Sequence, residues 1–402
     1  SNQLVGLVES ARGVAQLLAA PFIGLLADRF DRYLLIRIQA VVHVLPVCLL
    51  AAAIASDRHQ LLYLALPLFA VSNHLGKTVR DALLADNIEE GPRRTSTMSY
   101  NFSMTYVAQA AGPILQVFVL LAMGKHLLGT TAQDSWQVSE LKITLLAGCG
   151  MYLFGEPTSM LFQAAPPTPQ VGVAAVSPQH PRDRRAATVD VPSEDWRHDR
   201  VLRCCGRRAG TQKMWATPIL VEATFFFILL GSGMSTKFYP LYFTRSFGLS
   251  PFELCLLNVA ETLGVALLAR LNPTIVRRCG RARTAVLFML LAPLLLFAVV
   301  EVPWIAVVAP LFVLRTATAR AYIPLFQAIV ATCVPTEHRG KFAAMGAFRM
   351  SFFSGSAFVG SWLADRYASY RPAFLLTGVW QLLCVLLFVP VLLWLPKGSN
   401  DA

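Results

Sequence analysis

Residues 24–37 read Gly-Leu-Leu-Ala-Asp-Arg-Phe-Asp-Arg-Tyr-Leu-Leu-Ile-Arg. The stretch contains five charged side chains, four of them in a turn between two long apolar runs, Leu4 to Ala27 and Leu34 to Ala55, and the fifth, Arg37, at the start of the second run. A helix that crosses a bilayer needs roughly 20 mainly apolar residues, so each run is long enough to be one. A basic turn between two spanning helices lies on the cytoplasmic side. The stretch therefore predicts a helical hairpin in a membrane, with its turn in the cytoplasm.

The composition of the whole chain supports a membrane protein. Hydrophobic residues make up 55% and charged residues 14% of the chain, and the mean hydropathy is +0.54. A soluble domain has about 25% charged residues, so most of this surface is expected to face lipid. The net charge of +12 does not indicate a nucleic-acid partner, because the basic residues lie in turns and form no continuous face. The eight cysteines show no metal-ligand or disulfide spacing, so no metal site is expected.

The opening stretch resembles the loop signature of the major facilitator superfamily, Gly-x-x-x-Asp-Arg/Lys-x-Gly-Arg-Arg/Lys, which joins the second and third helices of that family. The matching residues are Gly24, Asp28, Arg29 and Arg32. Asp31 stands where the family usually has glycine, and Tyr33 where it has a second basic residue. The resemblance implies an all-α polytopic membrane protein with two pseudo-symmetric helical bundles. About 11 of the family's 12 helices are expected, in a fragment that lacks the first one.

Apolar runs predict eleven helices, numbered 2 to 12 as in the family. Their expected ranges are Leu4–Ala27, Leu34–Ala55, Leu61–Asp81, Tyr100–Met123, Lys142–Phe162, Trp215–Tyr239, Pro251–Leu271, Thr284–Val300, Trp304–Val330, Phe342–Ala364 and Arg371–Leu395. The resemblance divides the chain into an N-terminal bundle at 1–163, a flexible central cytoplasmic loop at 164–213, a C-terminal bundle at 214–396 and a cytoplasmic tail at 397–402. Basic clusters in alternate loops, such as Arg277-Arg278 and Arg93-Arg94, favour the same orientation.

In the family the signature loop holds the two bundles together on the cytoplasmic side. The resemblance implies such a latch from Gly24, Asp28, Arg29, Arg32 and Arg80, with Asp28 facing the start of helix 11 and Arg80 pairing with it. A carboxylate near a helix N-terminus gains typically 0.3–1 kcal/mol. The alternative is that Asp28 and Arg29 are solvated residues that only determine topology.

Ionisable residues inside the spans are functional candidates, because charge is costly at membrane depth. His74, Lys77 and Asp81 are spaced i, i+3, i+7 and share one helix face, beside Asn73. Arg315 and Tyr322 share a face of helix 10. By resemblance, helices 4 and 10 line the central cavity. Substrate-binding candidates are therefore Asn73, His74, Lys77, Arg315 and Tyr322, with Lys77 and Arg315 as the anion contacts. The alternative is that Arg315 is structural and bonded to carbonyl groups or an acid.

Two acidic residues are candidates for proton coupling, Glu222 in helix 7 and Glu261 in helix 8. A carboxylate removed from water holds a proton more readily. Glu261 could equally be the counter-ion of Arg315 or Arg349. In helix 2, Glu9 and Arg12 are one turn apart and are expected to form a structural ion pair.

The resemblance and the topology together predict a secondary active transporter that moves a small solute, an organic anion coupled to protons, by alternating access. Two alternatives stay open. One is a proton-coupled multidrug or neutral-solute exporter, because the Gly112-Pro113 pair in helix 5 resembles part of a motif of the family's drug:proton antiporters. The plainer interpretation of that pair is a kink that lets helices pack closely. The other is a non-transporting membrane receptor or scaffold. No catalytic or nucleotide-binding motif is present, so no enzyme activity and no cofactor are expected. The expected partners are a small solute and the lipid bilayer, with a monomer in the plasma membrane or an organelle membrane.

Overall fold

The protein is described by a computed structural model that covers residues 2–87, 93–122, 138–155, 211–334 and 339–394. Within these residues, fourteen helices form eleven membrane crossings, because three crossings are each built from two consecutive helices. The predicted end of helix 6 at 156–162, the central loop up to residue 210 and the tail at 397–402 lie outside the described residues.

The first bundle is built from six helices. These are α1 (Asn2–Arg29), α2 (Arg32–Ala55), α3 (His59–Asn87), α4 (Arg93–Gln109), α5 (Ala111–Ala122) and α6 (Val138–Gly155). Asp31 begins α2, because its side chain accepts a hydrogen bond from the backbone N–H of Tyr33 at 3.2 Å. Each predicted helix of this half is present, and α3 and α4 extend beyond their predicted ranges.

The second bundle is built from eight helices. These are α8 (Thr211–Thr236), α9 (Tyr239–Phe247), α10 (Pro251–Cys279), α11 (Arg281–Glu301), α12 (Ile305–Ala321), α13 (Ile323–Cys333), α14 (Arg339–Tyr367) and α15 (Arg371–Trp394). The first helix begins at Thr211, three residues inside the range predicted for the central loop. Ser250 and Glu253 form a capping box at the start of α10, each satisfying a backbone N–H of the other residue.

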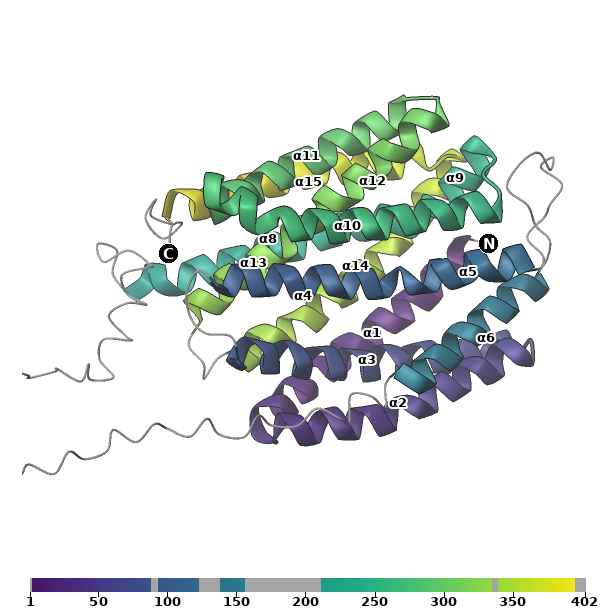
Figure 1. Cartoon of the computed structure of the whole chain (residues 1–402), viewed down its shortest axis with the longest axis horizontal. Helices are drawn as coiled ribbons and strands as arrows, with labels where there is room; N and C mark the ends of the chain where they lie inside the picture. Colours follow the sequence, from purple (N-terminus) through teal and green to yellow (C-terminus); the bar gives the residue numbers. More distant parts are fainter. Residues whose placement is uncertain (1, 88–92, 123–137, 156–210, 335–338, 395–402) are drawn as a thin grey trace, which may run out of the picture.

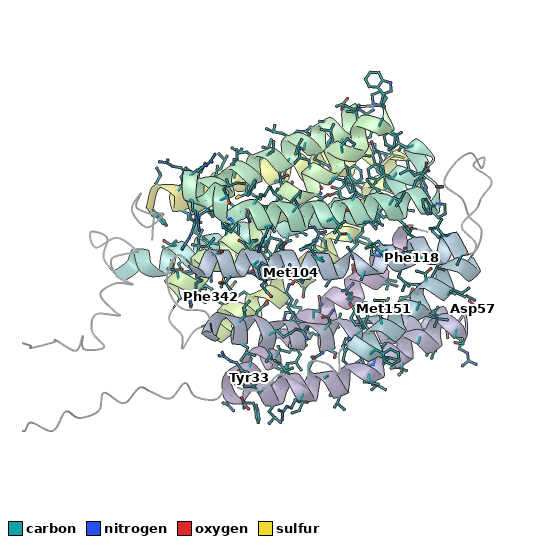
Figure 2. All side chains as sticks on the ribbon, in the orientation of Figure 1. Tyr33, Asp57, Met104, Phe118, Met151 and Phe342 are labelled. Carbon is teal, nitrogen blue, oxygen red and sulfur yellow. The ribbon has the colours of Figure 1, made fainter. Side chains whose placement is uncertain are left out.

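The helices lie side by side in two groups, with α10 next to α4 and α5 where the groups meet (Figure 1). Among the described residues, eight segments are long and apolar enough to cross a membrane, at 7–27, 32–55, 94–122, 216–247, 251–279, 281–301, 305–333 and 371–394. Large apolar side chains point outward from them, as Met104 on α4 and Phe118 on α5 show in Figure 2. The all-α membrane architecture with two bundles is therefore confirmed.

The two ends of the molecule differ in charge. The end at which α1 stops and α2 begins, on the left of Figure 1, is called here the arginine-rich end. It holds Arg29, Arg32, Arg277, Arg278, Arg281 and Arg283. Asp57 marks the other end, at the far terminus of α2 (Figure 2). By the positive-inside rule, we expect the arginine-rich end to face the cytoplasm.

The bundles meet along two interfaces. The first is between α1 and α14, where small residues allow the backbones to approach closely. A Cβ atom on Gly13 of α1 would lie 2.7 Å from the carbonyl oxygen of Ser351 in α14. Within the second bundle, a Cβ atom on Gly360 of α14 would lie 2.0 Å from the carbonyl oxygen of Met234. Small residues are typical of helix contacts in membranes, where packing drives association. Helix α14 is therefore held tightly between α1 and α8.

The second interface joins α4 to α10 and α13. Ser103 donates a hydrogen bond to the carbonyl of Ala266 at 2.8 Å, and buried Arg94 donates to the carbonyl of Ala331 at 2.9 Å. The α4–α5 crossing breaks at Ala110, beside the Gly112–Pro113 pair. A Cβ atom on Gly112 would meet nothing within 4 Å, so close helix packing does not explain that glycine.

Candidate functional site

A cavity of about 120 Å³ lies between α8, α9, α10 and α12. Most of its wall is apolar and aromatic, and its polar groups come from Thr236, Tyr239, Asn258 and Glu261. The remaining lining residues are Pro240, Phe243, Leu254, Leu257 and Phe312. A small, mainly apolar cavity with a few polar groups is the usual form of a small-molecule site.

Arg315 lies against this cavity wall. Its guanidinium group stacks on the ring of Tyr239, 5.1 Å from the centroid, and only 4% of the residue is exposed. Its Nε atom is buried without a hydrogen-bond partner, and among the described residues no acid lies within ion-pair distance of the group. The structural alternative, in which carbonyl groups or an acid satisfy this arginine, has no support among the described residues.

Glu261 belongs to the same site from the neighbouring helix. It is ten residues from the start of α10, as Arg315 is from the start of α12, so both lie about 15 Å inside the span. The side chain is half-buried, and within the described part of the chain it forms no hydrogen bond or ion pair. The positive charges of Arg320 and Arg315 both act on it, with that of Arg320 acting more strongly.

Arg320 finds its hydrogen-bond partner in the first bundle. Its Nη1 atom donates a hydrogen bond to the Tyr106 hydroxyl at 2.7 Å, and its guanidinium group lies 5.5 Å from that ring's centroid. Tyr106 is on α4, so this contact links the cavity region of the second bundle to the first. Neither Tyr106 nor Tyr239 could be singled out from the sequence, because both are neutral residues within apolar runs.

The polar residues of α3 form a separate group. His74 is buried, and its Nε2 atom lies 3.2 Å from the hydroxyl of Thr78 in a hydrogen bond. Asn73 and Asp81 are half-buried, whereas Lys77 is exposed. The structure thus places the three charged or titratable residues on one helix face, as the spacing predicts, but at different degrees of burial. None of them lines the cavity beside Arg315.

Arg349 of α14 pairs with Glu222 of α8, and both side chains are largely buried. The charge of Arg349 also acts on His74 and Asp81, which places the pair next to the polar face of α3. The suggestion that Glu261 is the counter-ion of Arg349 is therefore wrong, because Glu222 occupies that position. Glu222 stays a candidate for proton coupling only as one member of an ion pair.

Tyr322 lies at the junction of α12 and α13 and is packed in the core of the second bundle. Its ring contacts those of Phe225 and Phe326, with centroids 6.4 Å and 5.2 Å apart. The structure does not bring it to the wall of the cavity that Tyr239 lines.

The predicted latch is only partly visible. Arg32 donates a hydrogen bond from Nη1 to the carbonyl oxygen of Ala82 at 3.3 Å, so the signature turn is bonded to the end of α3. Gly24 is buried in α1 and Arg29 is exposed. Arg80 is half-buried, and its positive charge acts on its neighbour Asp81. Asp28 lies in the last turn of α1, and its side chain is outside what the structure describes. The latch therefore stays a prediction.

Glu9, Arg12 and Lys237 form a charged contact between the bundles, toward the end of the molecule opposite the arginine-rich end. The predicted pair of Glu9 and Arg12 is present at 3.6 Å, and Lys237 joins it with an N–O distance of 3.1 Å to Glu9. Lys237 lies between α8 and α9, so this cluster ties α1 to the second bundle. Lys237 was not among the residues predicted from the sequence, because nothing local shows which helix it faces.

Comparison with known proteins agrees with this architecture. The chain matches the Major Facilitator Superfamily over residues 1–203 and 221–402. No curated protein matches its sequence.

Among solved structures, it is similar to the human organic anion transporter MFSD10 (TETRAN), with a TM-score of 0.64 and 15% identity over 95% of this chain and 83% of that chain. It is also similar to the outward conformation of FucP, with a TM-score of 0.58 and 12% identity over 96% and 89% of the two chains. It is similar as well to an outward-facing bacterial homologue of the iron transporter ferroportin, with a TM-score of 0.58 and 12% identity over 95% of this chain and 88% of that chain. These likenesses establish the fold. With both family segments matched and the helical crossings in place, the chain belongs to the major facilitator superfamily, a family of transporters, and is an integral multi-pass membrane protein.

Proposed function

We propose that this protein moves a small organic anion across the membrane by alternating access, with Arg315 as the side chain that binds the anion. The observation that carries the proposal is the buried guanidinium group of Arg315, which stacks on Tyr239 without an acidic partner among the described residues. A buried charge is strongly unfavourable unless it is paired. A carboxylate or phosphate on the solute would supply the missing charge, since the planar guanidinium fork binds both groups bidentately.

The neighbouring cavity supports a solute with an apolar body. Tyr239, Phe243 and Phe312 line it with aromatic rings, and Leu254 and Leu257 add apolar surface. Such a wall favours a ring or an alkyl chain, while Asn258 can donate or accept a hydrogen bond. Asn73, His74 and Lys77 stay candidates for contacts from the first bundle, because α3 presents them on the face that approaches Arg349.

Glu261 is the candidate that we favour for proton coupling. It lines the cavity near two arginines and, within the described residues, has no ion-pair partner, so it can change its protonation without breaking a contact. Glu222 would have to give up its pair with Arg349. A solute anion at Arg315 would change the electrostatic environment of Glu261, which couples the two binding events.

The test is uptake of radiolabelled benzoate, succinate and glycerol phosphate into liposomes that contain the purified protein, with and without an inward proton gradient. The loss of a charge-assisted hydrogen bond corresponds to 1.5–3 kcal/mol, so Arg315→Ala should reduce uptake by roughly 10- to 150-fold. Arg245→Ala is the matched control. Arg245 also stacks on a tyrosine, 5.6 Å from the ring of Tyr370, but it is exposed and does not line the cavity.

Glu261→Gln tests the coupling separately. It should abolish the response of uptake to the proton gradient while exchange of labelled for unlabelled anion continues. Equal uptake by wild type and Arg315→Ala would contradict the role of Arg315. Uptake of neutral solutes or cations in place of anions would favour the exporter, and no uptake of any solute by folded protein would favour the receptor or scaffold.

A further inference from the structure

A cluster of arginines surrounds the turn between α10 and α11 at the arginine-rich end. Arg277 and Arg278 are in the last turn of α10, and Arg281 and Arg283 are in the first turn of α11. Gly280 makes the turn between them with a φ of 84°, in the region that favours glycine. The sequence from 277 to 283 contains four arginines and no acid.

Three of these arginines are exposed without a counter-charge. Arg277, Arg278 and Arg283 are exposed, and among the described residues none of them has a hydrogen bond or an ion pair from its side chain. The two on α10 suit a helix C-terminus, whose partial charge is negative. Arg283 lies at the start of α11, where the positive helix end disfavours a cation, and that turn contains no acid. The residues that the structure describes therefore leave this positive charge uncompensated.

Arg270 extends the cluster along the lipid-facing side of α10. It is seven residues before Arg277, which puts both on one helix face with Arg270 about 10 Å deeper. Arg270 is exposed, and its guanidinium group lies 4.7 Å from the ring centroid of Tyr100 on α4. An exposed arginine at this depth is costly unless its charge reaches the interface or meets an anion.

Beyond Arg270 the same surface is apolar. Leu263 and Leu267 of α10, both deeper than Arg270, are 44% and 64% exposed, and Met104 of α4 is exposed on the other side of the interface. The order along the helix is therefore arginines at the membrane surface, one arginine below them, and then exposed leucines. An anionic phospholipid has the matching order of charge and hydrocarbon.

We propose that the surface formed by Arg270, Arg277, Arg278 and Tyr100 binds the headgroup of an anionic phospholipid, with its acyl chains along Leu267 and Leu263. The phosphate accepts hydrogen bonds from the guanidinium groups of α10. The lipid comes from the leaflet at the arginine-rich end, where the positive-inside rule places the anionic cytoplasmic surface. Because Tyr100 is on α4, the bound lipid contacts both bundles where they meet. This inference does not depend on the transported solute.

The experiment measures lipid retention by native mass spectrometry of the purified protein, with phosphatidylglycerol and phosphatidylcholine added in equal amounts. Wild type should retain phosphatidylglycerol preferentially. The triple variant Arg270→Ala/Arg277→Ala/Arg278→Ala should lose that preference by at least ~10-fold, because each arginine near the surface contributes to anionic-lipid attraction. The matched control is Arg58→Ala/Arg245→Ala/Arg366→Ala, which removes three exposed arginines at the opposite end.

A double variant and a competition with inorganic phosphate complete the test. The double variant Arg277→Ala/Arg278→Ala changes only exposed side chains at the helix end, so it reports on the site even if the triple variant folds poorly. Millimolar inorganic phosphate should not displace the lipid, because the acyl chains contribute to binding. Equal preference in wild type and the double variant, equal loss in the opposite-end control, or displacement by phosphate would each overturn the proposal.

Discussion

Arg315 and Arg349 are both buried arginines inside membrane-spanning helices, and their surroundings differ. Each is ten residues from the start of its helix, so each lies about 15 Å inside the span, but they enter from opposite ends. Arg349 pairs with Glu222, whereas Arg315 has the face of Tyr239 and, among the described residues, no acid. The comparison indicates that a buried arginine with a fixed counter-ion holds helices together, and that one without a counter-ion is available to a ligand.

The largest expected effect on stability comes from breaking the ion pair of Glu222 and Arg349. Glu222→Gln leaves Arg349 largely buried without its ion-pair partner, and such a change costs about 3–5 kcal/mol. We expect a large fall in the temperature of thermal unfolding in detergent. The double variant Glu222→Leu/Arg349→Met should recover most of the loss, since it removes both charges. Glu301→Gln is the matched control, because it breaks an exposed pair with Arg371 and should cost under about 1 kcal/mol. Similar losses at Glu222 and Glu301 would remove the structural role of the buried pair.

Tyr106→Phe tests whether the contact of Arg320 with Tyr106 stabilises the fold, as the pair of Arg349 with Glu222 is expected to do. The change removes the acceptor of the 2.7 Å hydrogen bond and keeps the aromatic ring. A hydrogen bond to a charged group is worth about 1.5–3 kcal/mol, so unfolding should be easier by an amount in that range. Tyr100→Phe is the control, because the contact of that tyrosine with Arg270 uses only the ring. Equal effects of the two variants would show that the Tyr106 hydroxyl contributes nothing.

Arg315→Met should affect stability in the opposite direction from Arg349→Met. The contact with Tyr239 is worth about 2 kcal/mol when desolvated, but burial of an unpaired charge costs several kcal/mol. We therefore expect the unfolding temperature of Arg315→Met to stay the same or to rise by the equivalent of about 1 kcal/mol, while anion uptake falls. A fall in stability as large as that of Arg349→Met would mean that Arg315 has a structural partner outside the described residues.

The smallest expected effect is that of Asp28→Asn in the signature turn. A carboxylate near a helix N-terminus contributes about 0.3–1 kcal/mol, so this variant should insert and fold normally and transport more slowly, by less than roughly tenfold. The readouts are membrane-fraction yield and the initial rate of uptake. An unchanged rate would reduce the signature residues to topology determinants and leave only the interior arginines with distinct roles.

The lengths and order of the helices followed from the sequence, because the property that decides them is local. An apolar run such as Leu34–Ala55 has one favourable state in a bilayer, and α2 occupies Arg32–Ala55. The predicted pair of Glu9 and Arg12 was also local, one helical turn apart, and it is present. The breaks between α8 and α9 and at Tyr322 were not predicted, because hydropathy continues across them. The break at Ala110 lies beside Gly112-Pro113, the pair interpreted from the sequence as a kink.

The pairing of the charged residues depends on tertiary packing. The sequence alone places Arg315, Arg349, Glu222 and Glu261 inside spans, since each interrupts an apolar run. It could not assign Glu222 to Arg349 or add Lys237 to Glu9, because the partners are more than a hundred residues apart and their contact depends on which helices pack together. Helix packing also decides that Tyr322 lies in an aromatic core and that Tyr239 lies beside Arg315. A helix face has many candidate neighbours in the sequence, and packing selects one of them.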